Sequence, residues 1–202
     1  MITVGITGII GSGKTTVSAA LKKNGFAVID LDGLAKKAIT LKEVQEAIRR
    51  RLGNEYVKDG RVVVERLRDK VFTDKAGLEE LEKIVHPKVL EAMQRGMDSA
   101  QKAGRGVVVV DGPLIYEVGL HKSLDKIVVV SAQMDTIRER LKARGVSRDD
   151  MDRRISHQIP LEEKEKMADF VIYNNGTKEE LESETEDLIR RIKEWEVSVD
   201  AP

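Results

Sequence analysis

The sequence predicts an α/β protein in which helices cover a five-stranded parallel sheet in a three-layer α/β/α arrangement. Short apolar runs alternate with stretches of helical periodicity, as in chains that form parallel sheets. A glycine-rich turn over residues 8–15 joins the first apolar run to the first helical stretch. A helical segment without a strand pattern, about 41–103, interrupts the alternation, and we expect it to form an inserted subdomain.

Composition sets broad limits on the class of protein. The chain of 202 residues is long enough for one well-cored domain, and its formal net charge of zero disfavours a nucleic-acid-coating protein. It has no cysteine, which excludes disulfides and thiolate chemistry, and its three histidines form no close pair that would suggest a zinc site. No apolar run is long enough to span a membrane. We expect a cytoplasmic monomer or weak homo-oligomer without nucleic-acid or membrane partners.

The glycine-rich turn carries the strongest chemical signal. Residues 8–15 read GIIGSGKT and match the spacing G-x-x-x-x-G-K-[ST] of a phosphate-binding P-loop. Glycines let backbone N–H groups approach phosphate oxygens, and the helix that follows points its positive end at them. Lys14 would add a full charge, and the Thr15 hydroxyl can hold Mg²⁺. The alternative is a chance glycine-rich turn, which the flanking strand and helix patterns disfavour.

A helix over Thr15–Lys23 and a strand over Phe26–Asp30 should follow, and this strand ends in Asp30-Leu31-Asp32. Ligands bind at the carboxyl ends of parallel strands, so these carboxylates should lie near the P-loop. One of them could accept a proton from a substrate hydroxyl or help hold Mg²⁺. Alternatively, Asp32 caps the helical stretch Gly33–Ile39, and the residue types leave both interpretations open.

The inserted segment opens with an amphipathic helix over Leu41–Leu52. Its polar face carries Arg49, Arg50 and Arg51, which we interpret as a solvated helix end rather than a phosphate site. A turn region over residues 53–60 and a helix or strand-to-helix step over Val62–Phe72 should follow.

Asp74 then caps a long helical pattern, Lys75–Ala103, which we expect to be broken or bent at His86-Pro87. His86 could contact a ligand, although a lone histidine is more often structural.

Gly106–Asp111 is the clearest buried strand, because its four consecutive valines suit a strand covered on both faces. An apolar strand that ends in aspartate resembles a Walker B strand, whose carboxylate holds the Mg²⁺ shell. We prefer this role for Asp111 over a cap of the next turn. The predicted metal ligands are therefore Thr15 and Asp111. A loop or short helix should follow over Gly112–Glu117.

An arginine-rich stretch follows a fourth strand, Lys126–Ser131. A helix over Asp135–Arg144 and a helical stretch over Ser147–His157 carry six arginines: Arg138, Arg140, Arg144, Arg148, Arg153 and Arg154. A helix–turn–helix lid of this kind would neutralise charge on a transferring phosphoryl group and exclude water on closing. Surface ion pairs account for several of these residues, and we expect two or three to contact phosphate.

The last strand pattern is Ala168–Tyr173. Thr177 should cap the final helix, with Glu180 as its capping-box partner. This helix should end near Glu196 and leave a frayed tail over residues 197–202.

Together these motifs resemble those of the dephospho-coenzyme A kinase family, and the resemblance extends over essentially the whole chain. The matching segments are Gly5–Thr16, Ile29–Asp32, Val71-Phe72, His86-Pro87, Asp111–Glu117, Arg138 with Arg140 and Arg144, Gln158, and residues 168–176. The chain departs from the family pattern at Ile9, which is usually glycine, at Lys36, usually arginine, and at Val63-Val64, usually Asp-Arg.

The resemblance implies ATP- and Mg²⁺-dependent phosphorylation of the ribose 3′-hydroxyl of dephospho-coenzyme A. It implies ATP binding by Gly11, Ser12, Gly13, Lys14, Thr15 and Thr16, with contributions from Arg138 and Arg144. Asp32 would act as general base or orient the hydroxyl, and Lys14 and Arg140 would contact the transferred phosphoryl group. Asp32, His86, Pro87, Leu114 and Glu117 would line the acceptor site.

The implied organisation is one P-loop kinase domain with a core (1–40, 104–135 and 165–202), an acceptor-binding insertion (about 41–103) and a lid (about 136–164). Two other classes stay open. Another small-molecule or nucleoside monophosphate kinase would share the core and lid. A GTP-driven switch would share the P-loop, and Asp30–Gly33 fits D-x-x-G, but no N-K-x-D motif exists in the chain.

Overall fold

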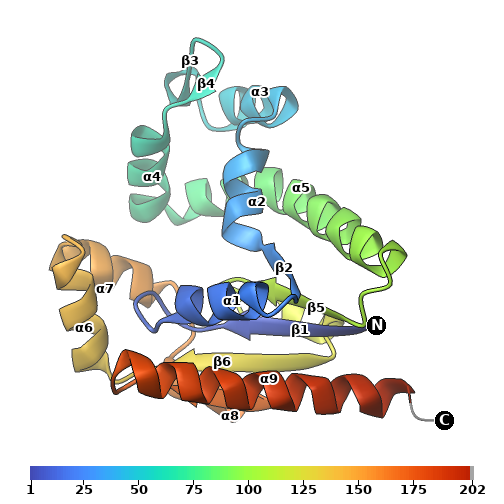
Figure 1. Cartoon of the computed structure of the whole chain (residues 1–202). Coiled ribbons are helices and arrows are strands. Elements are labelled where there is room, and N and C mark those ends of the chain that lie inside the picture. The colour runs from blue at the N-terminus through green and yellow to red at the C-terminus, as the bar shows by residue number, and fades with distance from the viewer. Residues whose placement is uncertain (201–202) are drawn as a thin grey trace. The chain divides into compact units, whose positions relative to one another are not determined.

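The computed structural model describes residues 1–200, which form two compact units. The sheet unit comprises Met1–Ile29 and the described residues from Ser99 onward, and the helical unit comprises Asp30–Asp98. Figure 1 shows both units with their helices and strands labelled. Within residues 1–200, none of the helices combines the length and apolar character needed to cross a membrane.

A five-stranded parallel sheet organises the sheet unit, in the order β2-β5-β1-β6-β7. Its strands are β1 (Ile2–Thr7), β2 (Ala27–Asp30), β5 (Val107–Asp111), β6 (Lys126–Ser131) and β7 (Phe170–Tyr173). Its helices are α1 (Lys14–Lys23), α6 (Met134–Ala143), α7 (Arg148–Ser156), α8 (Leu161–Lys166) and α9 (Lys178–Asp200), with a 3₁₀ turn η2 (Leu120–Ser123). The predicted α/β fold with five parallel strands is confirmed.

The core of the sheet unit explains why the apolar runs became strands. Each central strand is buried on both faces, and β5 is buried over its whole length. Val17 and Leu21 of α1 and Leu188 and Ile192 of α9 pack against the strands in one apolar cluster. The two helices lie along the sheet in Figure 1. This packing fixes the carboxyl ends of the strands, from which the loops of the site emerge.

The helical unit has its own apolar core. Its elements are α2 (Leu31–Ala38), α3 (Lys42–Arg51), the 3₁₀ turn η1 (Asn54–Tyr56), β3 (Val57–Lys58), β4 (Arg61–Val62), α4 (Val64–Thr73) and most of α5 (Lys75–Lys102). Val44 and Ile48 of α3 pack with Leu67 of α4 and with Ile84 and Val85 of α5. The amphipathic patterns of this segment therefore converge on one centre.

The inserted segment contains a small sheet, so the expectation of a segment without strands was wrong. β3 and β4 pair antiparallel, with Val57 opposite Val62. Asp59 and Gly60 connect them, and both have positive φ, 50° and 69°. Asp-Gly is a favoured pair for such a two-residue hairpin turn, because both positions need left-handed backbone.

Several predicted helix ends are corrected. The N-cap of α2 is Asp30, whose carboxylate accepts a hydrogen bond from the Gly33 N–H at 3.0 Å, so Asp32 is not the cap. The long helix α5 is continuous through Pro87, so it is not broken at His86-Pro87, and a bend there stays a prediction. The last helix, α9, continues to Asp200 and not to Glu196, so most of the tail expected to fray is helical; residues 201–202 lie outside the described residues.

Other local predictions are confirmed. Thr177 and Glu180 form the capping box, with hydrogen bonds of 2.8 and 3.2 Å. Asp74 accepts a hydrogen bond from the Ala76 N–H at 3.0 Å at the start of α5. The short helix α8 had no counterpart in the sequence prediction, because its charged run LEEKEK shows no apolar periodicity.

Leu188→Ala should destabilise the protein by about 2–5 kcal/mol, because it removes a fully buried side chain from the centre of the sheet-unit core. Val197→Ala is the matched control on the same helix, where the side chain is 71% exposed, and it should change stability by less than about 0.5 kcal/mol. Urea unfolding followed by circular dichroism measures both. Equal effects in the two variants would contradict the assignment of the core.

Candidate active site

The P-loop between β1 and α1 is built from glycines in conformations that other residues rarely adopt. Gly8, Gly11 and Gly13 have φ of 154°, 86° and 103°. A Cβ on Gly8 would collide with the carbonyl oxygen of Val130, and a Cβ on Gly13 would collide with the side-chain amide of Asn174. No side chain caps α1, which leaves the start of this helix open to an anion, although the Thr16 N–H already bonds the Gly13 carbonyl at 2.9 Å.

Lys14 and Asp111 meet at the carboxyl edge of the sheet. β1 and β5 pair in parallel register from Ile2 opposite Val107 to Ile6 opposite Asp111, so both strands end together. The Lys14 ammonium donates a hydrogen bond to the Asp111 carboxylate and forms an ion pair with it, and both side chains are largely buried. The lysine of the P-loop and the aspartate of the predicted Walker B strand are therefore in contact at the carboxyl edge of the sheet.

This place offers oxygen donors that suit Mg²⁺. Thr15 lies exposed in the first turn of α1, and Asp111 supplies a carboxylate at the end of β5. Within residues 1–200, no group of three or more His, Cys, Asp and Glu side chains could hold a metal by itself. Mg²⁺ needs no such group, because it is commonly bound through one or two protein ligands together with phosphate oxygens and water.

Arg140 is connected to the P-loop through Asn174. Its Nη2 donates a hydrogen bond to the Asn174 side-chain oxygen at 3.1 Å, and the Asn174 Nδ2 donates to the Ser12 carbonyl at 2.7 Å. Asn174 is buried directly after β7. The Arg140 Nη1 is buried and has no hydrogen-bond partner within the described residues. This leaves a guanidinium donor beside the loop that could serve a ligand.

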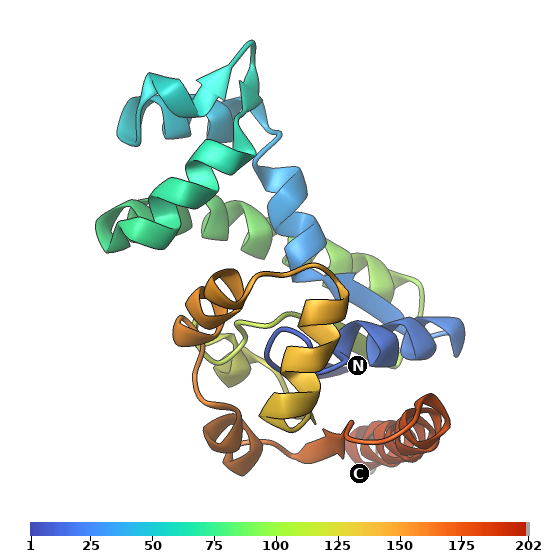
Figure 2. The same cartoon turned by 90° about the vertical axis from the view of Figure 1, so that its left-hand side faces the viewer.

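The helix that carries Arg140 also packs on the P-loop. A Cβ on Gly11 would lie 3.0 Å from Ile137 and 3.1 Å from Leu141, both on α6. Figure 2 shows α6 next to the loop that precedes α1, with α7 following it.

The other arginines of the predicted lid have a different setting. Arg138 pairs with Asp135 at 3.2 Å, Arg154 pairs with Asp150 at 2.8 Å, and Arg148 lies 3.8 Å from Asp152. The Arg153 Nε donates to the Asp149 carbonyl at 3.1 Å, and Arg144 is the exposed C-cap of α6. Local contacts on the helix surface thus account for several of them.

Glu117 belongs to a polar cluster inside the sheet unit. Its Oε1 accepts hydrogen bonds from the Ile159 N–H at 2.9 Å and from the Lys164 ammonium at 2.7 Å. Lys164 is fully buried and also donates to the Pro113 carbonyl at 2.9 Å. Burial lowers the pKa of Lys164, the ion pair with Glu117 opposes this, and the nearby charge of Lys14 lowers the pKa further. Leu114 is half-buried in the turn that leads to Glu117.

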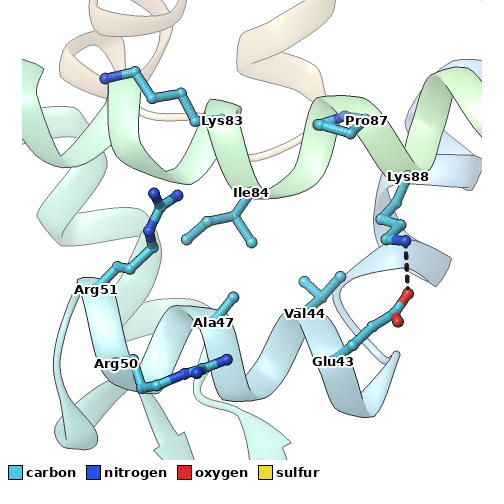
Figure 3. A pocket seen from close by; sticks show the side chains of 9 residues that line it. All are labelled: Glu43, Val44, Ala47, Arg50, Arg51, Lys83, Ile84, Pro87 and Lys88. Atoms are coloured by element: carbon cyan, nitrogen blue, oxygen red, sulfur yellow. Dashed lines mark ion pairs between the residues drawn. The ribbon is translucent and has the colours of Figure 1, made fainter.

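The remaining predicted site residues belong to the helical unit. Asp32 is exposed in the first turn of α2. Pro87 lines a groove of about 500 Å³ between α3 and α5, with Val44, Ala47 and Ile84 as apolar lining (Figure 3). The cationic side chains of this groove are Arg50, Arg51, Lys83 and Lys88, and Lys88 pairs with Glu43 at 2.9 Å. His86, Pro87 and Leu90 line a neighbouring depression of about 520 Å³.

The arginine run of α3 behaves largely as a solvated helix end. Arg49 pairs with Glu46 at 3.0 Å and Arg51 pairs with Glu80 at 2.9 Å. Arg50 is mostly exposed and lies 4.0 Å from Glu46.

Comparison with known proteins adds an independent line of argument. The family model described as dephospho-CoA kinase matches residues 2–180. This chain belongs to the dephospho-CoA kinase family. A dephospho-CoA kinase of Corynebacterium glutamicum is 36% identical over 199 residues, which covers 95% of this chain and 98% of that protein.

Two solved structures are also similar to this member of the family. TT1252 from Thermus thermophilus has a TM-score of 0.80 and 37% identity and covers 94% of this chain and 97% of its own. The dephospho-CoA kinase from Campylobacter jejuni has a TM-score of 0.71 and 25% identity, with coverages of 94% and 96%.

Sequence reasoning missed two side chains of this site. Asn174 was given no role, although a polar residue directly after a predicted strand, at the carboxyl edge of the sheet, was a usable signal. Lys164 gave no signal, because it lies in a run of charged residues and only the fold distinguishes it from Lys166.

Asn174→Ala should weaken ATP binding by roughly ten- to hundredfold, because the Ser12 carbonyl loses a donor and Arg140 loses an acceptor in a buried setting. Isothermal titration with a non-hydrolysable ATP analogue measures the Kd. Asn24→Ala is the control, since the exposed Asn24 side chain donates a hydrogen bond to the Ala20 carbonyl at the other end of α1. Its Kd should stay within about twofold of the parent. A normal Kd for Asn174→Ala would contradict the proposed link.

Proposed function

We propose that the protein transfers the γ-phosphoryl group of ATP to the ribose 3′-hydroxyl of dephospho-coenzyme A, giving coenzyme A and ADP. The observation that carries this proposal is the P-loop lysine paired with Asp111, beside an arginine tied to the same loop, in a member of the dephospho-CoA kinase family. Positioning and charge neutralisation are the main needs of phosphoryl transfer, and these groups supply both.

On the donor side, the backbone N–H groups from Gly11 to Thr16 would bind the ATP phosphates. Lys14 would exchange its carboxylate partner for phosphate oxygens, and the Arg140 Nη1 would donate to the transferring group. Asn174 holds Arg140 beside the P-loop, which supports stabilisation of the charge that spreads over the phosphoryl oxygens. Arg138 and Arg144 are exposed on α6, and their contact with ATP remains a prediction.

We propose that Mg²⁺ is held by Thr15 and Asp111 together with phosphate oxygens. When bound, the metal neutralises phosphate charge and polarises the group that is transferred. An oxygen-only ligand set at the end of β5 supports this choice over a softer metal.

On the acceptor side, Asp32 would take the proton of the attacking hydroxyl or orient it. The position of Asp32 supports this role, because it lies exposed in the first turn of α2, directly after the carboxyl end of β2. His86, Pro87, Leu114 and Glu117 would line the acceptor site. The cytoplasmic location and the monomeric or weakly oligomeric state remain predictions.

Asp32→Asn should lower kcat by about two to four orders of magnitude if the carboxylate acts as general base, and should leave the Kd for ATP nearly unchanged. Steady-state kinetics with dephospho-coenzyme A and titration with ATP measure the two quantities. Asp69→Asn, which changes an exposed acid on α4, is the control and should keep the parent kcat. A near-normal kcat for Asp32→Asn would remove Asp32 from the chemistry.

A coupled ADP-release assay should give turnover with dephospho-coenzyme A and none above background with AMP, UMP or shikimate. Chelation of Mg²⁺ by EDTA should abolish the turnover, and added Mg²⁺ should restore it. Turnover with one of the other acceptors but not with dephospho-coenzyme A would favour another small-molecule kinase.

A further inference from the structure

Lys164 is a charged side chain placed where water cannot reach it. It is fully buried on the short helix α8, whereas Lys166, two residues later, is exposed. Moving an ammonium group out of water costs free energy unless the group is paired and hydrogen-bonded. The contacts of Lys164 therefore indicate why the fold keeps a lysine there.

One set of contacts leads to the P-loop. The Lys164 Nζ donates to the Pro113 carbonyl at 2.9 Å, and the same carbonyl accepts a hydrogen bond from the Thr7 hydroxyl at 3.1 Å. Thr7 is the last residue of β1 and directly precedes Gly8. Pro113 follows Asp111 by two residues, so the contact also holds the start of the loop that leaves β5 beside Lys14.

The other set of contacts leads to the arginine-bearing helices. The Lys164 Nζ lies 2.7 Å from the Glu117 Oε1, and this oxygen also accepts the Ile159 N–H at 2.9 Å. Ile159 belongs to the connection between α7 and α8. The Glu117 Oε2 is buried without a hydrogen-bond partner within residues 1–200. The Lys164 ammonium and the Ile159 N–H therefore together hold this carboxylate, both through its Oε1.

We propose that Lys164 is a positioning residue for phosphoryl transfer, whose ammonium fixes the loop after β5 and the α7–α8 connection to the end of β1. The arginine-bearing helices precede that connection, and Arg140 on α6 reaches the P-loop through Asn174. Lys164 therefore fixes the connection that follows α7 at the C-terminal end of the predicted lid. Arg140 and Asn174 fix α6 at its N-terminal end. This inference rests on the proposed function.

A positioning role and a purely structural role predict different kinetics. Loss of a structural ion pair lowers the amount of folded enzyme and reduces every activity in proportion. Loss of a positioning residue changes how the folded enzyme divides phosphoryl groups between acceptor and water, because lid closure excludes water. The ratio of ATP hydrolysis without acceptor to transfer with acceptor therefore separates the two roles.

The test compares Lys164→Met and Lys164→Gln with the control Lys166→Met on the same helix. Met keeps the packing volume, and Gln keeps one N–H donor. In protein with a native circular dichroism spectrum, we expect kcat for transfer to fall by about 10²-fold in Lys164→Met, as for a small misplacement of reacting groups. The KM for ATP should change little. The ratio of ATP hydrolysis to phosphoryl transfer should rise, because a misplaced lid excludes water less well. Lys166→Met should keep the ratio of the unmodified enzyme.

An unchanged ratio in folded Lys164→Met or Lys164→Gln would overturn the inference. If neither single variant folds, Lys164→Met combined with Glu117→Gln removes both charges, and its ratio is compared with that of Glu117→Gln alone. Equal ratios in these two variants would overturn the inference as well, and a higher ratio in the combined variant supports it. Failure of the unmodified protein to phosphorylate dephospho-coenzyme A would contradict the proposed function instead.

Discussion

The parallel pairing of β1 with β5 is the constraint on which the site depends. Their register ends with Ile6 opposite Asp111, so the P-loop and the loop after β5 start from the same edge of the sheet. A slip of one residue would turn the valines of β5 to the opposite faces and move the carboxylate away from Lys14. A slip would also leave the largely buried charges of Lys14 and Asp111 unpaired, and this cost opposes it.

Two further buried polar side chains near the Lys14–Asp111 ion pair connect segments that are distant in the sequence. Asn174 joins the end of β7 to the P-loop and to α6, and Lys164 joins α8 to the loop after β5. Both side chains are buried, and each donates a hydrogen bond to a backbone carbonyl outside the sheet, that of Ser12 or that of Pro113. The geometry around the P-loop therefore depends on side chains that are distant from it in the sequence.

The sequence was sufficient to predict the five-stranded sheet and the glycine-rich loop after its first strand, because apolar runs and glycine spacing depend directly on backbone geometry. It was ambiguous where one residue could do either of two tasks. Asp32 was considered either as a functional carboxylate or as the cap of the following helix, and the structure shows that Asp30 is the cap of α2. The Asp59-Gly60 pair is typical of a hairpin turn, but strands of only two residues show no periodic pattern, so the hairpin was not predicted.

The arginines and Lys164 show where sequence reasoning ends. Six arginines lie on α6 and α7 or next to them, and nothing in their spacing distinguishes Arg140, whose link to the P-loop depends on the position of Asn174. The burial of Lys164 arises from contacts with residues 47 and 51 positions earlier in the chain. Charge and periodicity are local properties, and they carry no information about such long-range partners.

The contribution of α9 to the core has a consequence for how the protein folds during synthesis. Leu181, Leu188 and Ile192 complete the apolar cluster beneath the sheet, yet they leave the ribosome after every strand they cover. The helical unit, Asp30–Asp98, carries its own core and can close while translation continues. On this face of the sheet, Val17 and Leu21 of α1 are the only helix residues of the apolar cluster that can cover the strands until α9 emerges, so part of the cluster stays exposed on the nascent chain.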